Sequence, residues 1–262
     1  MNTWRTALVQ SDETHIRIRG FDITALMRQA GFVDTIFLLH RGRLPSDAER
    51  RLLDAILVAV SDHGAGAPSC AAARLAASGN RQSISAAIAA GVLAIGDEHG
   101  GAGETCMRMI AGQLGGDGGS PEDAARRAVD DATGSGTRLP GLGHRVHTTD
   151  PRVAVLFDMA RELGVAGDGI RFMTALEAET ATRIKRLPIN IDGALAAVLH
   201  DLSFPPEAGK FIFIVGRVAG LTAEVAEEYA REKAMRIRIP IEYDGEAPRE
   251  LIRPDSPATK KD

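Results

Sequence analysis

A loop opened by glycines gathers side chains that handle protons and bind anions. Residues 140–152 read PGLGHRVHTTDPR and contain two histidines, two arginines and one aspartate. Imidazoles exchange protons near neutral pH, and guanidinium groups bind carboxylates in forked pairs. His144 follows the glycines. Arg152 follows an Asp-Pro pair typical of a helix start, so we expect it in the first helical turn, pointing back toward the loop. A solvated basic loop is the alternative.

Two other stretches place one titratable side chain beside small or apolar residues. His99 lies in GDEHGGAGE (96–104), where glycines let the backbone approach a ligand closely. Asp192 lies in an N-x-D pattern ahead of the apolar GALAAVL. The first stretch is also consistent with a helix–helix turn carrying an exposed histidine, and the second with a simple helix cap. Neither stretch alone decides between a structural and a catalytic role.

Arg217 is harder to explain by folding alone. It lies within FIFIVGRVAGL, and a guanidinium buried among apolar residues is costly without a carboxylate or phosphate partner. Either Arg217 faces solvent on an amphipathic helix or it holds an anion, and the apolar residues on both sides favour the anion. His63, in SDHGAGAPS, ends a predicted helix before a Gly/Pro break, where a C-cap role is the alternative to ligand binding.

Missing motifs narrow the chemistry further. The sequence has no HExxH or paired ligand spacing, so we expect no metal site. It has no G-x-S-x-G elbow, which argues against Ser–His–Asp catalysis. Acid–base chemistry at a carbonyl remains: histidines donate hydrogen bonds, a carboxylate moves a carbon-bound proton, and arginines hold substrate carboxylates.

The composition is that of an ordinary globular protein. The 262 residues are 44% hydrophobic and 25% charged, with a net charge of -4, which gives no indication of nucleic-acid or membrane-surface binding. Cys70 and Cys106 are the only cysteines, too few for a disulfide scaffold. No signal-peptide core or membrane-length apolar run occurs. We therefore expect a soluble, cytoplasmic protein.

Apolar spacing predicts a mainly α fold. Two segments are expected to be extended, 15–20 as an edge hairpin and 236–245 as a short tail. A capping box at Ser46 and Glu49 and a break at Gly31 mark individual helix ends. The helical segments expected are 21–42 (broken at Gly31), 46–63, 83–96, 120–132, 150–164 and 205–235, the last as two helices.

Glycine-rich breaks punctuate the middle of the chain and predict two domains. They occur at 96–103, 114–119 and 134–143. We expect a smaller helical domain (104–196) inserted into a large helical domain (1–103 and 197–262).

The order of these motifs resembles that of the citrate synthase superfamily along nearly the whole chain. Segment 17–49 is similar to that family's R-G-y opening segment, and DHGAGAPSCAAAR to the stretch carrying its first substrate-binding histidine. DEHGGAGE matches its H-G-G-A-x-E motif, GLGHRV its G-x-G-H-R-V motif, and NID and GRVAG its N-x-D and G-R-x-x-G motifs. With the D-P-R arginine, the resemblance picks out His63, His99, His144, Arg152, Asp192 and Arg217.

This resemblance implies a two-domain helical homodimer. Such an enzyme makes or breaks the bond between the acetyl-CoA methyl carbon and the keto carbon of oxaloacetate. His99 is then expected to polarise the thioester carbonyl, Asp192 to exchange the methyl proton, and His144 to hydrogen-bond the oxaloacetate carbonyl. A CoA thioester is expected as substrate, with no covalently bound cofactor and no metal.

The resemblance also implies residues that bind the substrate without moving protons. Three are expected to hold its carboxylates, and the backbone of two glycines to approach the thioester. A further arginine arrives from the neighbouring subunit, for which Arg236 is our choice and Arg238 the alternative. The full set is His63, Arg152 and Arg217 for the carboxylates, Gly141 and Gly143 for the thioester, and Arg236 across the interface.

Several departures from the family pattern favour one of the family's reactions over the others. The chain begins almost at the R-G-y segment, the loop before Arg152 is one residue short, and Thr148 stands where a basic residue often contacts CoA. GVLAIGDEHGGAGE resembles the citryl-CoA lyase module of ATP-citrate lyase more than a typical synthase.

We therefore expect a citryl-CoA lyase, which cleaves citryl-CoA to acetyl-CoA and oxaloacetate. A citrate or 2-methylcitrate synthase is the alternative. A catalytically silent CoA-binding or regulatory subunit is a third hypothesis, which the presence of all three expected catalytic groups disfavours.

Overall fold

The protein is mainly α-helical, as the apolar spacing predicts. The computed structural model describes residues 3–116, 119–143 and 150–251, and within these ranges the chain forms eleven helices and three short strands. Across those same ranges, every helix is too short or too polar to cross a membrane. The helices are α1 (Ile23–Gln29), α2 (Phe32–Arg41), α3 (Asp47–Val60), α4 (Pro68–Gly79), α5 (Ile84–Leu93), α6 (Ala102–Leu114), α7 (Pro121–Ser135), α8 (Pro151–Glu162), α9 (Asp168–Arg183), α10 (Ile191–Asp201) and α11 (Ala208–Arg231).

The N-terminal region forms a small antiparallel sheet. Strand β2 (Ile16–Ile18) pairs with β1 (Val9–Ser11) on one side and with β3 (Phe21–Asp22) on the other. The extended character expected for 15–20 is confirmed, but the strand is central rather than at the edge. The Asp22 carboxylate then accepts a hydrogen bond from the Thr24 amide and starts α1.

Local sequence signals set most helix ends. Glu49 and Ser46 form the expected reciprocal capping box, with a 2.7 Å bond from the Ser46 amide to the Glu49 carboxylate. Gly31 separates α1 from α2, and Asp150 with Pro151 begins α8. The end expected for the 46–63 helix is wrong: α3 stops at Val60 with Ser61 as its C-cap, so His63 lies beyond the helix.

The 205–235 segment forms one 24-residue helix, α11, and not the two expected. Gly216 and Gly220 lie inside it because they face the end of α3. A Cβ at position 220 would overlap the carbonyl oxygen of Ser61, so only glycine lets the two helices approach this closely. Each glycine costs about 1 kcal/mol of helix propensity relative to alanine, and burial of residues such as Ile212 and Leu221 offsets that cost.

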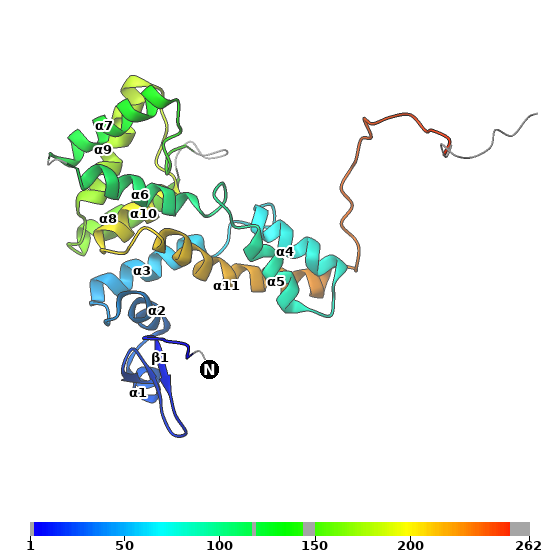
Figure 1. Ribbon diagram of the computed structural model, residues 1–262, viewed down its shortest axis with the longest axis horizontal. Helices are drawn as coiled ribbons and strands as arrows, with labels where there is room; N and C mark the ends of the chain where they lie inside the picture. Colours follow the sequence, from blue (N-terminus) through cyan, green and yellow to red (C-terminus); the bar gives the residue numbers. More distant parts are fainter. Residues whose placement is uncertain (1–2, 117–118, 144–149, 252–262) are drawn as a thin grey trace, which may run out of the picture.

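Two hydrophobic clusters share α11. The larger is built from α2, α3, α6 to α10 and the first half of α11, and the smaller from α4, α5 and the second half of α11. Figure 1 shows α6 to α10 gathered at one end and α4 and α5 beside α11. The expected domain boundaries, at 103/104 and 196/197, fall inside α6 and α10, and the division into two domains stays a prediction.

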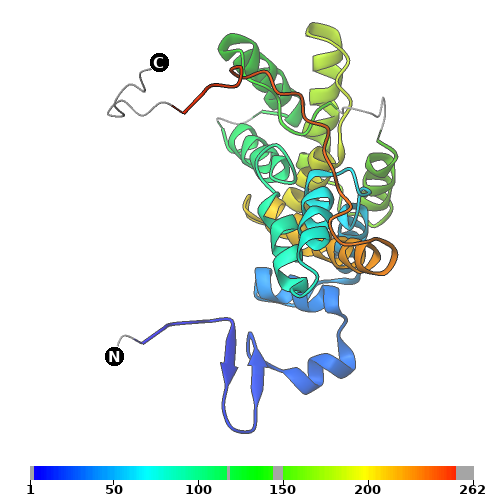
Figure 2. The same cartoon turned by 90° about the vertical axis from the view of Figure 1, so that its right-hand side faces the viewer.

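The C-terminal segment is extended and unpaired. Residues 236–251 contain no helix or strand; the segment starts beside α4 and α11, and Figure 1 shows its later part leading away from the helices, with Figure 2 giving the second view. Ile239, Ile241 and Tyr243 are exposed along it at 67%, 88% and 76%. These large apolar side chains are left largely uncovered by the described residues.

We expect Gly220→Ala to destabilise the fold by about 1–3 kcal/mol, because the added methyl group meets the Ser61 carbonyl in a close-packed contact. Urea unfolding followed by circular dichroism measures the change. Gly112→Ala is the matched control: Gly112 lies within α6, and a Cβ there meets nothing within 4 Å. That variant should be unchanged or slightly more stable. Equal effects of the two substitutions would contradict the close-approach argument.

Candidate active site

The two arginines expected to bind carboxylates meet at the C-terminal end of α3. Arg152 donates from Nη1 to the Ala59 carbonyl at 3.0 Å, and Arg217 donates from Nε to the Val60 carbonyl at 2.9 Å. The last carbonyls of a helix lack intrahelical partners and carry its negative dipole end. Consecutive carbonyls of one helix end therefore hold guanidinium groups that come from α8 and α11.

Arg217 is buried, with 2% of its surface exposed. Its guanidinium lies over the ring of Phe213, 4.9 Å from the centroid, and donates from Nη1 to the Ser69 hydroxyl at 3.1 Å. Within the described ranges, no carboxylate lies within ion-pair distance of it. Among the described residues, this buried cation contacts one carbonyl, one hydroxyl and one ring face, an environment that suits an anionic ligand. The solvent-facing alternative for Arg217 is wrong.

Ser69 connects Arg217 to His99. Its hydroxyl lies 2.9 Å from His99 Nε2, and its backbone N–H donates to the same nitrogen at 3.3 Å. Because an amide N–H can only donate, Nε2 is the accepting nitrogen of the neutral ring. The Ser69 hydroxyl accepts from Arg217 and so donates onward to Nε2. This chain of bonds leaves the imidazole proton on Nδ1, free to donate to a substrate carbonyl.

His99 is held in its neutral form. Burial lowers its pKa below the usual value for histidine, and the charges of Arg217 and His63 lower it further. The ring stands edge-on to Phe213, with the two ring centres 6.0 Å apart. A neutral imidazole with a fixed Nδ1–H is suited to polarise a carbonyl without transferring a full proton.

Asp192 lies in the first turn of α10, where the sequence predicts either a cap or a base. Asn190 is the cap: its side-chain oxygen accepts from the Gly193 amide at 3.1 Å, which leaves the Asp192 carboxylate unused by the helix. Burial raises the pKa of Asp192 to about 6, against the opposing charges of Arg152 and Arg217. A carboxyl group with this pKa exchanges protons readily near neutral pH.

The glycine loop is fastened to the segment that leads into α10. Gly143 donates to the Pro188 carbonyl at 2.7 Å and its own carbonyl accepts from Asn190 Nδ2 at 2.8 Å. Gly141 has a left-handed backbone (φ +81°), and a Cβ there would lie 2.7 Å from both the Cys106 sulfur and the Gly193 Cα. These contacts give both glycines a structural role, while their expected approach to a thioester stays a prediction.

Of the other two histidines expected in the site, the structure describes His63 but not His144. His63 lies in the exposed segment between α3 and α4, and its charge contributes to lowering the pKa of His99. His144 lies outside the described residues, as do Arg145, His147 and Thr148.

Arg236 has partners within its own chain. It ion-pairs with Glu228, which is fully buried, at 2.6 Å and with Glu232 at 3.1 Å. Arg74 of α4 binds Glu228 as well, so the start of the C-terminal segment is tied to α4 and α11. Arg238, two residues on, is exposed and forms no hydrogen bond or ion pair with another described residue. Of these two arginines, Arg238 is the one without such a partner among the described residues.

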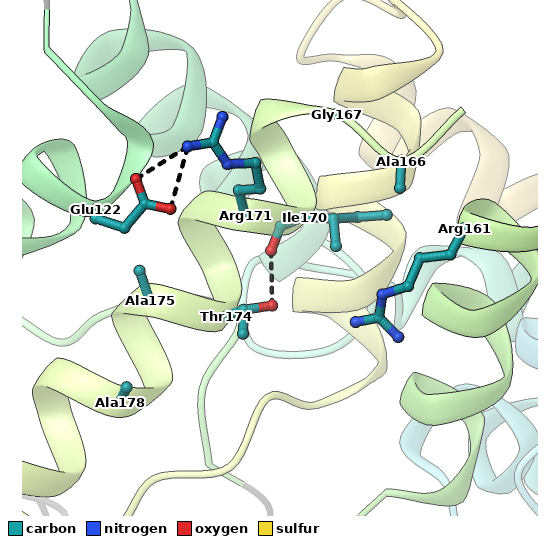
Figure 3. Close-up of a pocket in the computed structure, with 9 residues that line it drawn as sticks. All are labelled: Glu122, Arg161, Ala166, Gly167, Ile170, Arg171, Thr174, Ala175 and Ala178. Carbon is teal, nitrogen blue, oxygen red and sulfur yellow. Dashed lines mark hydrogen bonds and ion pairs between the residues drawn. The ribbon is translucent and has the colours of Figure 1, made fainter. Parts of the chain in front are cut away.

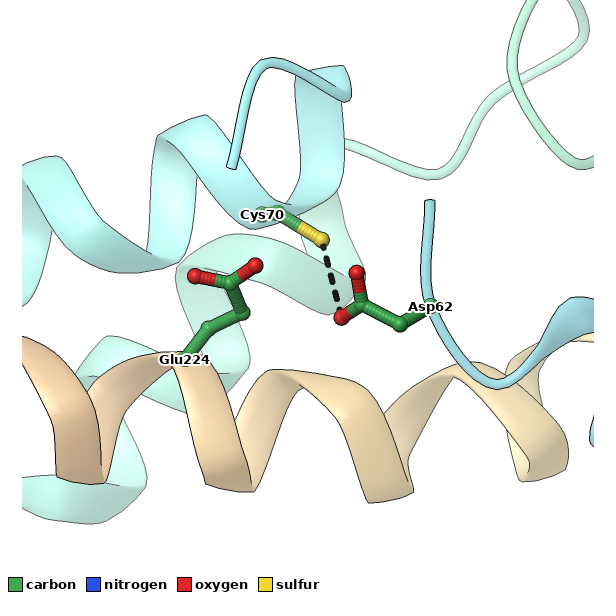
Figure 4. Close-up of side chains that lie close together, drawn as sticks. All are labelled: Asp62, Cys70 and Glu224. Atoms are coloured by element: carbon green, nitrogen blue, oxygen red, sulfur yellow. Dashed lines mark hydrogen bonds between the residues drawn. The ribbon is translucent and has the colours of Figure 1, made fainter. Parts of the chain in front are cut away.

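One cluster near the site has the residue types of a cation site. Asp62, Cys70 and Glu224 bring their ligand atoms within 4.8 Å of one another, as Figure 4 shows. Glu224, however, already binds the Arg74 guanidinium, and the Cys70 sulfur contacts Asp62 at 3.7 Å. Burial and the Asp62 charge raise the pKa of the Cys70 thiol, which disfavours the thiolate that metals need.

A cavity of about 720 Å³ adjoins the glycine loop. Its wall combines the apolar side chains of Leu139 and Leu142 with the exposed cations Arg138 and Lys185. A separate cavity of about 370 Å³ between α8 and α9 contains none of the expected site residues. Figure 3 shows that Arg171 in that cavity is already paired with Glu122.

Sequence reasoning missed three contributors to this site. Ser69 carried no motif of its own, although it follows the Pro68 helix start by one residue. Phe213 stands one helical turn before Arg217, a spacing that places both on one face of α11. The Asp-Pro pattern predicts Asp150 only as a helix cap, yet its carboxylate also accepts hydrogen bonds from the Arg152 side chain.

Comparison with known proteins agrees with the fold. Residues 46–238 match the citrate synthase C-terminal domain. The chain therefore belongs to the citrate synthase family.

Particular relatives are similar over most of the chain. The citrate synthase of Haloferax volcanii is 29% identical over 232 residues, which cover 87% of this chain and 59% of that enzyme. The 2-methylcitrate synthase 2 of Corynebacterium glutamicum is 30% identical over 245 residues, 90% of this chain and 61% of that one. The chain thus spans about three fifths of the length of these synthases. The structure of citryl-CoA lyase from Hydrogenobacter thermophilus superposes with a TM-score of 0.87 at 38% identity, covering 95% of this chain and 98% of that one.

Ser69→Ala should reduce kcat by about 10- to 100-fold, because His99 loses the hydroxyl that links its Nε2 to Arg217. Steady-state turnover of a CoA thioester measures the change. Ser78→Ala is the matched control, since Ser78 is equally buried in the same helix but its hydroxyl has no hydrogen-bond partner in the described structure. Full activity in the Ser69 variant would show that this link does not orient His99.

Proposed function

We propose that this protein is a citryl-CoA lyase that cleaves citryl-CoA into acetyl-CoA and oxaloacetate. The observation that carries the proposal is the chain of bonds from Arg217 through Ser69 to His99. The charge of the same Arg217 also acts on the buried Asp192 carboxyl on α10, whose pKa is about 6. A neutral N–H donor, a proton-exchanging carboxyl and buried cations are the parts that carbon–carbon cleavage through an enolate requires. The 38% identity to a citryl-CoA lyase, over 98% of that protein, favours cleavage over condensation.

The proposed cleavage assigns one step to each of three groups. His144, assigned by its motif, takes the hydroxyl proton of citryl-CoA as the carbon–carbon bond opens and the oxaloacetate carbonyl forms. The bonding electrons pass to the acetyl unit as an enolate, and the Nδ1–H of His99 stabilises the developing oxygen charge. Protonated Asp192 then delivers its proton to the methylene carbon and gives acetyl-CoA. Solvent returns the His144 proton to Asp192.

The substrate is held by its negative charges. Arg152 and Arg217, with His63 beside them, bind the carboxylates of the oxaloacetate half. The cavity beside the glycine loop accommodates the CoA half, with Arg138 and Lys185 near the phosphates and the two leucines against apolar atoms. In this assignment the thioester is expected beside Gly141 and Gly143.

A homodimer completes the proposal. The extended C-terminal segment exposes apolar side chains and carries Arg238, which lacks a partner among the described residues. We assign Arg238, rather than Arg236, as the arginine that enters the neighbouring subunit's site. A cytoplasmic location fits the two free cysteines, Cys70 and Cys106.

Purified protein incubated with citryl-CoA should release oxaloacetate, measured by a coupled NADH-dependent reductase. Asp192→Asn should abolish this release, because the enolate then has no proton donor. Cleavage needs the protonated carboxyl, and the pKa of Asp192 is about 6, so kcat should fall as pH rises above about 6. Condensation needs the carboxylate, so in that direction kcat should fall as pH drops below the same value.

Two other outcomes are distinguishable in the same experiment. Release of free CoA from acetyl-CoA or propionyl-CoA plus oxaloacetate, with no cleavage of citryl-CoA, would identify a synthase. Binding of CoA thioesters without turnover in either direction would identify a silent subunit. Either result would overturn the lyase proposal.

Two inactive variants should complement each other if Arg238 acts across the interface. Asp192→Asn and Arg238→Gln each disable a site, but a mixed dimer contains one site with both residues intact. After joint unfolding and refolding at equal concentrations, about a quarter of wild-type activity should return, because half of randomly mixed dimers are mixed and each has one working site. No recovery would mean that Arg238 serves its own subunit, whereas full activity of Arg238→Gln by itself would mean that it serves no site.

A further inference from the structure

One buried carboxylate beside the site is used neither by the proposed reaction nor by the packing of the core. Asp150 has only 3% of its surface exposed and precedes the first turn of α8. Its Oδ1 accepts the Arg152 amide N–H at 3.1 Å, the bond of an ordinary N-cap. The same carboxylate also accepts two bonds from the Arg152 side chain, from Nε at 2.9 Å and from Nη2 at 2.7 Å.

We propose that Asp150 is a positioning residue that clamps one edge of the Arg152 guanidinium and so presents the remaining donors of Arg152 to the substrate carboxylate. The proposal rests on the proposed function, in which Arg152 binds the oxaloacetate half of the substrate. It gives Asp150 a role that an N-cap alone does not require.

The donor inventory of Arg152 supports the clamp. A guanidinium has five N–H groups. Asp150 takes the Nε–H and one Nη2–H, and the Ala59 carbonyl takes one Nη1–H. Among the described residues, one N–H on each terminal nitrogen therefore has no partner, and a carboxylate can accept from both. The side chain of Arg152 is 22% exposed and that of Asp150 only 1%, so the clamp lies behind the guanidinium and the solvent-facing part stays available.

Charge is the second consequence of the clamp. Several groups of the described structure interact electrostatically with the Asp192 carboxyl. They are Asp150 at the N-cap of α8, Arg152 in α8, Arg217 in α11 and the buried Cys106 thiol in α6. Arg152 and Arg217 lower the pKa of Asp192, whereas the negative charge of Asp150 raises it. Asp150 thus lets an arginine stand beside the proton-exchanging carboxyl without making that carboxyl strongly acidic.

Capping and clamping can be separated by substitution. Asparagine and serine cap helices about as well as aspartate, so Asp150→Asn and Asp150→Ser keep the bond to the Arg152 amide. Neither has two anionic oxygens, so neither can hold both Nε and Nη2. A role confined to capping predicts wild-type behaviour in both variants, whereas the clamp predicts a loss of substrate binding.

The test measures oxaloacetate binding by calorimetry and, in parallel, KM, kcat and the pH profile of turnover. We expect Asp150→Asn and Asp150→Ser to weaken oxaloacetate binding and raise KM by about tenfold or more, the effect of one misplaced charge-assisted pair. The pH midpoint that reports Asp192 should move to lower pH. Asp22→Asn is the control, because Asp22 caps α1 in the N-terminal region with the same bond geometry.

A double-mutant cycle tests whether Asp150 acts through Arg152. In an Arg152→Gln background, Asp150→Asn should cause little further loss of binding, because the group that it positions is gone. Equal losses in both backgrounds, or wild-type binding and pH profile in both Asp150 variants, would overturn the proposal. Wild-type protein that neither binds oxaloacetate nor turns over would instead overturn the proposed function, which keeps the two failures distinct.

Discussion

The end of α3 is the feature on which the rest of the site depends. Its last carbonyls, at Ala59 and Val60, have no partners within the helix and carry the negative end of the helix dipole. Two guanidinium groups from distant helices satisfy them, which neutralises the helix end and concentrates positive charge at one point. This local positive charge attracts anionic ligands. The protein thus forms a site for anions although its net charge is -4.

Close packing brings the second arginine to this position. α11 crosses the end of α3 so closely that only glycine fits at the contact, and this approach buries Arg217 between Phe213 and Ser69. The same burial removes water from His99 and lowers its pKa. The fold therefore fixes both the position and the protonation state of the imidazole with one set of contacts.

Opposed charges set the behaviour of the carboxyl group on α10. Burial raises the pKa of Asp192, and the charges of Arg152 and Arg217 lower it. The negative charge of Asp150 raises it and so offsets part of the effect of the arginines. The balance leaves a group that exchanges protons near neutral pH. The glycine loop is joined to the start of α10 by two hydrogen bonds of Gly143, one to Pro188 and one to Asn190. These bonds fix the position of the helix turn that carries Asp192.

The sequence by itself determined the elements whose signals are local. The capping box at Ser46, the Asp-Pro start of α8 and the mainly α class follow from hydrogen bonds and apolar spacing within a few residues. The order of motifs also indicated the citrate synthase family, which the match over residues 46–238 confirms. These predictions needed no knowledge of which helices pack together.

Tertiary structure decided what those residues touch. The bonds from Arg152 to Ala59, from Arg217 to Val60 and from Arg217 to Ser69 join residues 93, 157 and 148 positions apart, so no local pattern predicts them. The single helix α11 likewise depends on its packing against distant helices, and Glu228, which holds Arg236, also binds Arg74, 154 positions away. The sequence supplied the chemical groups. Only packing brought them together, because burial and partner choice are properties of the folded chain.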